Sequence, residues 1–199
     1  MGKIFYIMGM SASGKDSIFR ELASDPALGL KTVVMYTTRP MRKGEADGRE
    51  YFFRDEAFLA VEKEAGRVIE SRTYETVCGP WSYFTLDDGQ IDLESSNYLM
   101  IGTLESYEKM KQYFEVRGRR AMVPLYIHVE DGERLLRAIR REQLQTAPNY
   151  AELCRRFLAD SEDFRAERLE KGGICRIFEN NSLETCIGEI KKEIITNLS

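Results

Sequence analysis

The chain of 199 residues is 43% hydrophobic and 31% charged, which predicts one folded domain with room for a small inserted lobe. Its formal net charge of −4 argues against nucleic acid as a partner, because a phosphate backbone needs a basic surface. No apolar run approaches the roughly 18–20 residues that span a bilayer, so no membrane partner is expected.

Strand and helix patterns alternate along the chain. Short apolar or β-branched runs predict strands, and apolar residues at helical spacing predict helices, the first of which ends at Asp25-Pro26. In chain order we expect a strand at 3–8, a helix at 16–24, a strand at 32–36, a helix at 56–65, strands at 67–74, 81–86 and 97–102, a helix at 104–117, a strand at 121–129, a long helical region at 131–169 interrupted near 146–149, a strand at 174–178 and a helix at 182–197.

Four strands of the buried type are each followed by a helix. This alternation predicts an α/β fold in three layers, α/β/α, with a parallel core sheet covered on both faces. The stretch at about 36–90 breaks the alternation and predicts an inserted mixed lobe. The expected organisation is a single domain, 1–199, with its core at 1–35 and 91–199.

The cysteines are widely scattered and form no CxxC pair, and the single histidine, His128, gives no metal-ligand pattern. We therefore expect buried or partly buried free thiols in a reducing compartment, the cytoplasm. The oligomeric state stays open between a monomer and a homodimer. The cysteines are Cys78, Cys154, Cys175 and Cys186.

The segment GMSASGKD, which starts at Gly9, matches the phosphate-binding loop G-x-x-x-x-G-K. It follows a predicted strand and opens a predicted helix, so that backbone N–H groups, the helix dipole and a lysine converge on phosphates. The simpler interpretation is a tight turn with an incidental lysine. The residues expected to hold a phosphate chain are Gly9, Ser11, Ala12, Ser13, Gly14, Lys15, Asp16 and Ser17.

Asp16 stands where this motif usually carries a hydroxyl that coordinates Mg²⁺. Its carboxylate would bind Mg²⁺ or one of its waters, since hard cations favour oxygen ligands. Alternatively, Asp16 is a first-turn acid that the helix dipole favours, and Ser17 meets the metal. The sequence leaves both alternatives open.

A second group of polar residues follows in the loop from Tyr36 to Phe53. Arg39 and Arg42 are three residues apart, and Glu45 and Tyr51 follow. Arginine binds phosphate through two parallel N–H donors, and a tyrosine hydroxyl adds a third, so the group is a candidate anchor for a monophosphate. Glu45 would hold Arg42 or accept a hydrogen bond from a nucleobase. The simpler interpretation is a solvated charged loop.

The order of the two motifs resembles the guanylate kinase family: an N-terminal phosphate-binding loop, then T-T-R-x-x-R-x-G-E-x-x-G-x-x-Y-x-F. Val68-Ile69-Glu70 is similar to the family's F-I-E, and Phe178–Asn181 to its late loop near the adenine. The resemblance implies a P-loop NTPase-like fold and a kinase that moves the γ-phosphoryl of Mg·ATP to GMP or a related monophosphate.

The resemblance also implies roles for individual residues. Lys15 would act on the ATP phosphates, Arg39, Arg42 and Tyr51 would hold the acceptor's phosphate, and Glu70 would accept hydrogen bonds from guanine. Ser82 or Tyr83 would replace the contacts of the family's Y-Y-G-[ST] turn. A helical lid near 137–156 would bring further catalytic arginines, for which a salt-bridged helix face is the simpler interpretation. The lid candidates are Arg137, Arg141 and Arg156.

Two positions depart from the family. Met35 stands where a serine contacts guanine, and Met100-Ile101-Gly102 replaces a D-x-D motif. One hypothesis is that Asp16 supplies the lost metal ligand.

Two rival functions remain. The segment Gly14–Ser17 also resembles ribose 1,5-bisphosphate phosphokinase, although that family lacks the Arg39–Tyr51 loop. A guanylate-kinase-like binding module without catalysis is the other rival, although such modules usually lose the lysine of the phosphate-binding loop.

Overall fold

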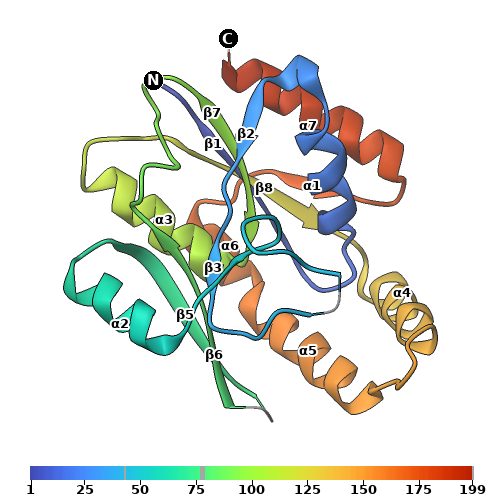
Figure 1. Cartoon of the computed structure of the whole chain (residues 1–199). Coiled ribbons are helices and arrows are strands. Elements are labelled where there is room, and N and C mark those ends of the chain that lie inside the picture. The colour runs from blue at the N-terminus through green and yellow to red at the C-terminus, as the bar shows by residue number, and fades with distance from the viewer. Residues whose placement is uncertain (43, 77–78, 199) are drawn as a thin grey trace.

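The computed structural model describes residues 1–42, 44–76 and 79–198. The described residues form two sheets with helices around them (Figure 1). The core strands are β1 (Ile4–Gly9), β2 (Leu30–Thr32), β7 (Asn97–Gly102), β8 (Met122–His128) and β9 (Ile177–Glu179). The second sheet contains β3 (Tyr36–Thr37), β4 (Phe52–Phe53), β5 (Val68–Thr76) and β6 (Gly79–Leu86).

The helices follow the expected alternation. They are α1 (Lys15–Ala23), a short 3₁₀ turn (Pro26–Leu28), α2 (Glu56–Glu64), α3 (Leu104–Glu115), α4 (Asp131–Gln143), α5 (Tyr150–Asp163), α6 (Ala166–Gly172) and α7 (Leu183–Leu198). Several begin at a side chain that accepts a backbone N–H, as polar N-cap residues do. Asp55 caps α2, Thr103 caps α3 and Asn149 caps α5.

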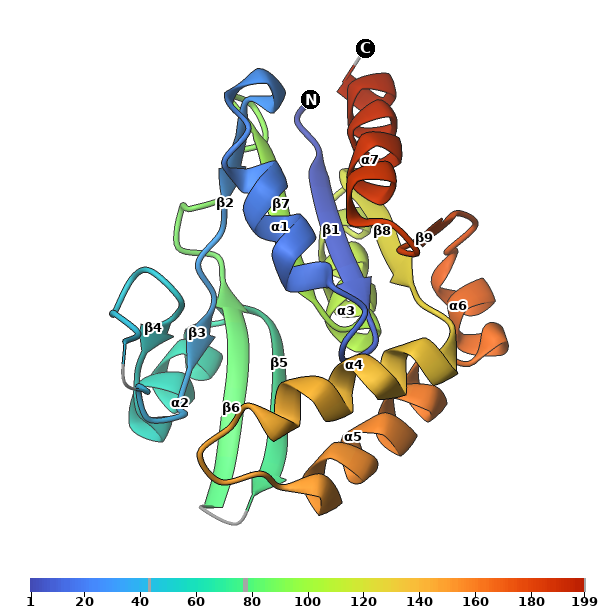
Figure 2. The same cartoon turned by 90° about the vertical axis from the view of Figure 1, so that its right-hand side faces the viewer.

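The core sheet is parallel throughout, in the order β2-β7-β1-β8-β9, which confirms the predicted fold class. Alternate residues of β1 pack on the two faces of the core sheet. Phe5 and Ile7 pack with α1 and α7, whereas Ile4, Tyr6 and Met8 pack with α3. Figure 2 shows the two termini at one end of this sheet and α4 and α5 across the opposite end, where β1 leads into α1.

The second sheet has the order β4-β3-β6-β5 and is mixed, since only β3 and β4 run parallel. One of its faces packs against α2 through Tyr36, Leu59, Phe84 and Leu86. A bulge between Val68 and Glu70 shifts the pairing of β5 with β6. Because a bulge reverses the side on which later residues point, Glu70 pairs with Thr85 on the face away from α2.

The prediction of one strand at 32–36 was wrong. β2 ends at Thr32 in the core sheet, and β3 begins at Tyr36 in the second sheet. Between them, the side chain of Gln90 accepts a hydrogen bond from the N–H of Val34 and donates one to the carbonyl oxygen of Val34. The segment at 32–36 therefore passes from one sheet to the other. Between the sheets, the side-chain amide of Gln90 makes the hydrogen bonds that a neighbouring strand would make.

The long helical region at 131–169 is three helices. The predicted break near 146–149 lies between α4 and α5, and a second, unpredicted break separates α5 from α6. Buried Phe164 ends α5 and stacks on Tyr126 of β8, with 5.4 Å between the ring centroids. Packing of this ring against the core accounts for the second break.

Three cysteines lie in the described part of the chain, and all three are free. Cys186 is buried as expected, and burial raises its pKa to about 11. Cys154 and Cys175 are exposed, so the expectation of burial was wrong for them. Cys78 lies outside the described residues. Within the described ranges, no helix combines the length and the apolar character needed to cross a membrane.

Candidate functional site

The loop from Gly9 to Lys15 has the backbone geometry of a phosphate-binding loop. Ala12 and Gly14 both have positive φ, 64° and 86°, and Gly14 precedes the first residue of α1. A Cβ on Gly14 would lie 2.4 Å from Asn180 Nδ2, and one on Gly9 would lie 2.6 Å from the carbonyl oxygen of Ile127. Gly14 is therefore required by its dihedral angle and by a close neighbour, whereas Gly9 is required by a close neighbour alone.

The late loop supports this turn. Asn180 is buried, its Nδ2 donates to the carbonyl oxygen of Ser13 at 2.8 Å, and its own N–H donates to His128. The hydroxyl of Ser13 is buried and has no hydrogen-bond partner among the described residues. An unsatisfied buried donor beside Lys15, at the N-terminus of a helix, fits an oxygen-rich anion such as the phosphate chain of ATP.

Asp16 and Ser17 differ in what surrounds them. The side chain of Asp16 is 78% exposed and lies 3.7 Å from Lys15 Nζ, whereas Ser17 Oγ accepts from Arg20 at 3.4 Å. No group of three or more metal-ligating side chains occurs in the described ranges. Mg²⁺ is commonly held by one or two protein oxygens plus phosphates. Both residues fit that small contribution, and the two alternatives for the metal stay open.

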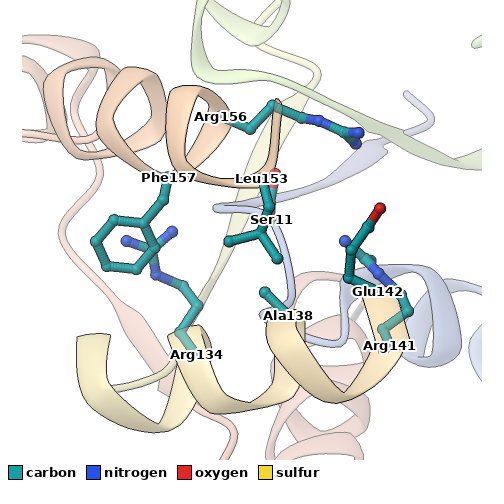
Figure 3. A pocket seen from close by; sticks show the side chains of 8 residues that line it. All are labelled: Ser11, Arg134, Ala138, Arg141, Glu142, Leu153, Arg156 and Phe157. Atoms are coloured by element: carbon teal, nitrogen blue, oxygen red, sulfur yellow. The ribbon is translucent and has the colours of Figure 1, made fainter. Parts of the chain in front are cut away.

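The three arginines predicted for the lid lie in two places. Arg141 and Arg156 line a small cavity of about 10 Å³ beside Ser11, where α4, α5 and the phosphate-binding loop meet (Figure 3). Arg137 points elsewhere: it donates to Glu133 and to the carbonyl oxygen of Asn180. The structure thus brings two of the three predicted arginines to the loop, and the third supports Asn180.

Sequence reasoning missed the contact between α5 and the phosphate-binding loop. The N–H of Ser11 donates to Asp160 Oδ2 at 2.6 Å. The same oxygen lies 3.5 Å from the fully buried Arg134, which stacks on Phe157 and pairs with Asp131. Asp160 follows Arg156 by four residues, which places both on one face of α5. The carboxylate of Asp160 therefore accepts a hydrogen bond from a backbone N–H of the loop that could otherwise donate to a phosphate.

Arg39, predicted to bind the acceptor's phosphate, is 3% exposed. Its Nη2 lies 2.8 Å from Glu45 Oε1, and its guanidinium lies over the rings of Tyr51 and Phe53. Burial disfavours the charge of Arg39, but the hydrogen bonds and charge interactions with Glu45 and Tyr83 together outweigh burial, so the pKa of Arg39 is raised. Glu45 holds Arg39 and not the side chain of Arg42, although it accepts from the backbone N–H of Arg42 at 2.7 Å. Arg42 itself is exposed.

Tyr51, on this loop, is influenced by a charge on the phosphate-binding loop. Burial raises the pKa of Tyr51, the charge of Asp16 adds to that rise, and the charges of Arg39 and Arg72 oppose it. The ring of Tyr83 lies 5.6 Å from that of Tyr51. Residues of the two motifs are thus close enough to act on one another electrostatically.

Glu70 and Ser82 lie on opposite faces of the second sheet. Glu70 pairs with Thr85, and Arg72 pairs with Tyr83, on the face away from α2. The hydroxyl of Ser82 bonds Thr73 and Glu56 on the other face. The structure therefore groups Tyr83, and not the side chain of Ser82, with Glu70.

Tyr6 and Arg72 lie beside the end of β7, where the family's D-x-D motif is missing. A Cβ on Gly102 would lie 2.1 Å from the hydroxyl of Tyr6, which donates to Ser106 at 2.6 Å. Tyr6 therefore takes the space of a side chain at position 102. Arg72, which sequence reasoning missed, bridges β5 to the next residue, Thr103.

Known proteins resemble this chain in sequence mainly over its N-terminal part. The guanylate kinase family model matches residues 1–78. A guanylate kinase of Rhodopseudomonas palustris (strain HaA2) is 42% identical over 69 residues, which are 35% of this chain and 31% of that protein. A guanylate kinase of Streptococcus agalactiae serotype III (strain NEM316) is 40% identical over 93 residues, 44% of each chain. The chain thus spans less than half the length of these curated relatives.

The fold extends the likeness. The crystal structure of guanylate kinase from Anaplasma phagocytophilum superposes with a TM-score of 0.64 at 16% identity, over 98% of this chain and 86% of that one. At this identity the superposition shows the fold alone. The sequence likeness to guanylate kinases covers residues 1–78, and the likeness in fold extends over nearly the whole chain.

Proposed function

We propose that this protein is an ATP-dependent nucleoside monophosphate kinase that moves the γ-phosphoryl of Mg·ATP to GMP. The observation that carries the proposal is the phosphate-binding loop, in which Gly14, Lys15 and the buried hydroxyl of Ser13, which has no partner within the described ranges, meet at the start of α1. The family resemblance supplies the acceptor, since Arg39, Tyr51 and Glu70 stand at the matching positions.

In this proposal the core comprises 1–35 and 91–199, the acceptor-binding lobe about 36–90, and the lid about 137–156. Lys15 neutralises charge on the ATP phosphates, and Arg39 and Tyr51 fix the acceptor's phosphate. Arg141 and Arg156 lie beside Ser11, so they close over the transferred group. Asp16 or Ser17 contributes to the Mg²⁺ site, and the metal would offset charge on the phosphates. Alignment and charge neutralisation are the main needs of phosphoryl transfer.

An acceptor panel tests the proposal. ADP formation from Mg·ATP is measured with GMP, dGMP, AMP and ribose 1,5-bisphosphate, and GMP or dGMP is expected to be phosphorylated. Lys15→Met should lower kcat/KM by about 100-fold or more, because the variant loses a positive charge at the transferred group. Lys63→Met, on the distant helix α2, is the matched control. Turnover of ribose 1,5-bisphosphate alone, or no nucleotide turnover or binding, would refute the proposal.

A further inference from the structure

Two charged side chains on β5, Glu70 and Arg72, face each other in the interior of the protein. Their residues are 3% and 8% exposed, and Arg72 Nε lies 3.1 Å from Glu70 Oε2. Arg72 Nη2 lies 3.4 Å from Glu70 Oε1, which also accepts a hydrogen bond from Thr85 Oγ1 at 3.1 Å. Both carboxylate oxygens therefore already face donors that belong to this chain.

The core holds Arg72 from the other side. Its Nη1 donates to Thr103 Oγ1 at 2.9 Å. Thr103 follows β7 directly and caps α3, so its position is fixed by the core sheet. The guanidinium thus spans from the second sheet to the core, with Glu70 as its charged partner.

Arg72 presents to Glu70 the same hydrogen-bond donors as a guanine base would. A guanidinium offers a carboxylate two parallel N–H donors. Guanine offers the same pattern through N1–H and its exocyclic amino group. Glu70 is the residue that the proposed function assigns to that edge of guanine, and in this structure Arg72 already occupies its carboxylate. A base that uses Glu70 must therefore displace Arg72.

The pair is imperfectly aligned. Glu70 Oε2 and Arg72 Nε are both buried, yet neither makes a hydrogen bond to any residue in the described ranges. Well-formed charged pairs of this type have shorter and straighter contacts, near 2.7–2.9 Å. A contact that leaves a buried donor and a buried acceptor unsatisfied is one that a ligand with better geometry can replace.

We propose that Arg72 is a specificity-determining residue of the acceptor site, because it competes with the nucleobase for the carboxylate of Glu70. The inference rests on the proposed function. Guanine gains only the difference between its own contacts and those of Arg72, so selectivity for guanine is weaker than a free carboxylate would give. Met35 and Gly102, which replace two polar residues of the family pattern, act in the same direction.

Acceptor kinetics test the competition. kcat and KM are measured for GMP, IMP and AMP at saturating Mg·ATP in the wild type, Arg72→Met and Arg72→Lys. Arg72→Met should raise the kcat/KM ratio of GMP to AMP about tenfold, mainly through a lower KM for GMP. Arg72→Lys should give a smaller rise, since an ammonium keeps the charge but loses the two-donor geometry. Arg67→Met, a change of the same kind just before β5, should leave the ratio unchanged.

A double-mutant cycle identifies Glu70 as the shared partner. Glu70→Gln should reduce the preference for GMP only slightly when Arg72 is present. The same change should abolish the gained preference in the Arg72→Met background, so the two effects are coupled. Independent effects of the two substitutions would contradict the proposed competition.

The remaining outcomes separate this inference from the proposed function. A fall in the GMP to AMP ratio in Arg72→Met would mean that Arg72 reads the base directly, and an equal change for every acceptor would mean a structural role; either overturns the competition. A wild type that phosphorylates no nucleotide refutes the proposed function instead. Thermal unfolding checks each variant, and Arg72→Lys keeps the buried charge paired if Arg72→Met does not fold.

Discussion

The phosphate-binding loop and the sheet face that carries Glu70 both lie in the part of the chain that matches the guanylate kinase family model, but they depend on the sequence differently. In the loop the proposed phosphate contacts come from the backbone, so they depend on the glycines and on the dihedral angles of the turn. On the sheet face the function depends on which side chain lies beside Glu70. There Arg72, two residues further along β5, lies against the carboxylate of Glu70 and would compete with a ligand for it.

The largest expected effect comes from Gly14→Ala in the loop. An alanine there takes a positive φ, which costs about 1–2 kcal/mol, and its Cβ also meets Asn180. Gly66→Ala is the matched control, because Gly66 has a φ of 68° but open space around it. Urea unfolding should show a larger loss for Gly14→Ala, and calorimetry should show loss of ATP binding in that variant alone. Equal losses and retained ATP binding would mean that Asn180 does not shape the loop.

The next effect concerns the contact between α5 and the loop. Asp160 holds the N–H of Ser11 and places a negative charge where phosphates would bind. Asp160→Asn removes the charge and keeps the shape, so the Kd for ATP should fall several-fold, by about 1 kcal/mol. Asp163→Asn, an exposed change on the same helix, is the control. A weaker affinity for ATP in Asp160→Asn would show that the carboxylate supports nucleotide binding instead of competing with it.

A smaller effect distinguishes the two faces of β6. Tyr83→Phe should raise KM for the acceptor about threefold, because it removes a hydroxyl near Arg39 and the net contribution of one hydrogen bond is about 0.5–1.5 kcal/mol. Ser82→Ala should leave this KM unchanged and lower stability, since Ser82 bonds Thr73 and Glu56 on the opposite face. The reverse result would assign the acceptor contact to Ser82.

These comparisons indicate what the sequence alone predicts. The parallel core and the loop at Gly9–Lys15 were predictable, because hydrophobic periodicity and a local motif specify them. The side on which Glu70 points was not, because it depends on a bulge between Val68 and Glu70. Nor was the pairing of Asp160 with Ser11, which joins residues 149 positions apart. Contacts of that kind depend on how elements pack, and no local pattern encodes them.

The smallest effect concerns acid stability in the loop that carries Arg39 and Glu45. The hydrogen bond to Arg39 holds the pKa of Glu45 below its ordinary value of 4.5. A carboxyl group whose pKa is lowered in the folded state contributes stability at a pH above 4.5, and that contribution is lost as the pH falls through the folded pKa. Glu45→Gln should therefore be less stable than the wild type at neutral pH, and the two should converge below pH 4.5. Glu64→Gln on α2 is the control. Thermal unfolding between pH 3 and 7 measures the difference, and a gap that stays constant with pH would show that Glu45 acts through packing and not through its charge.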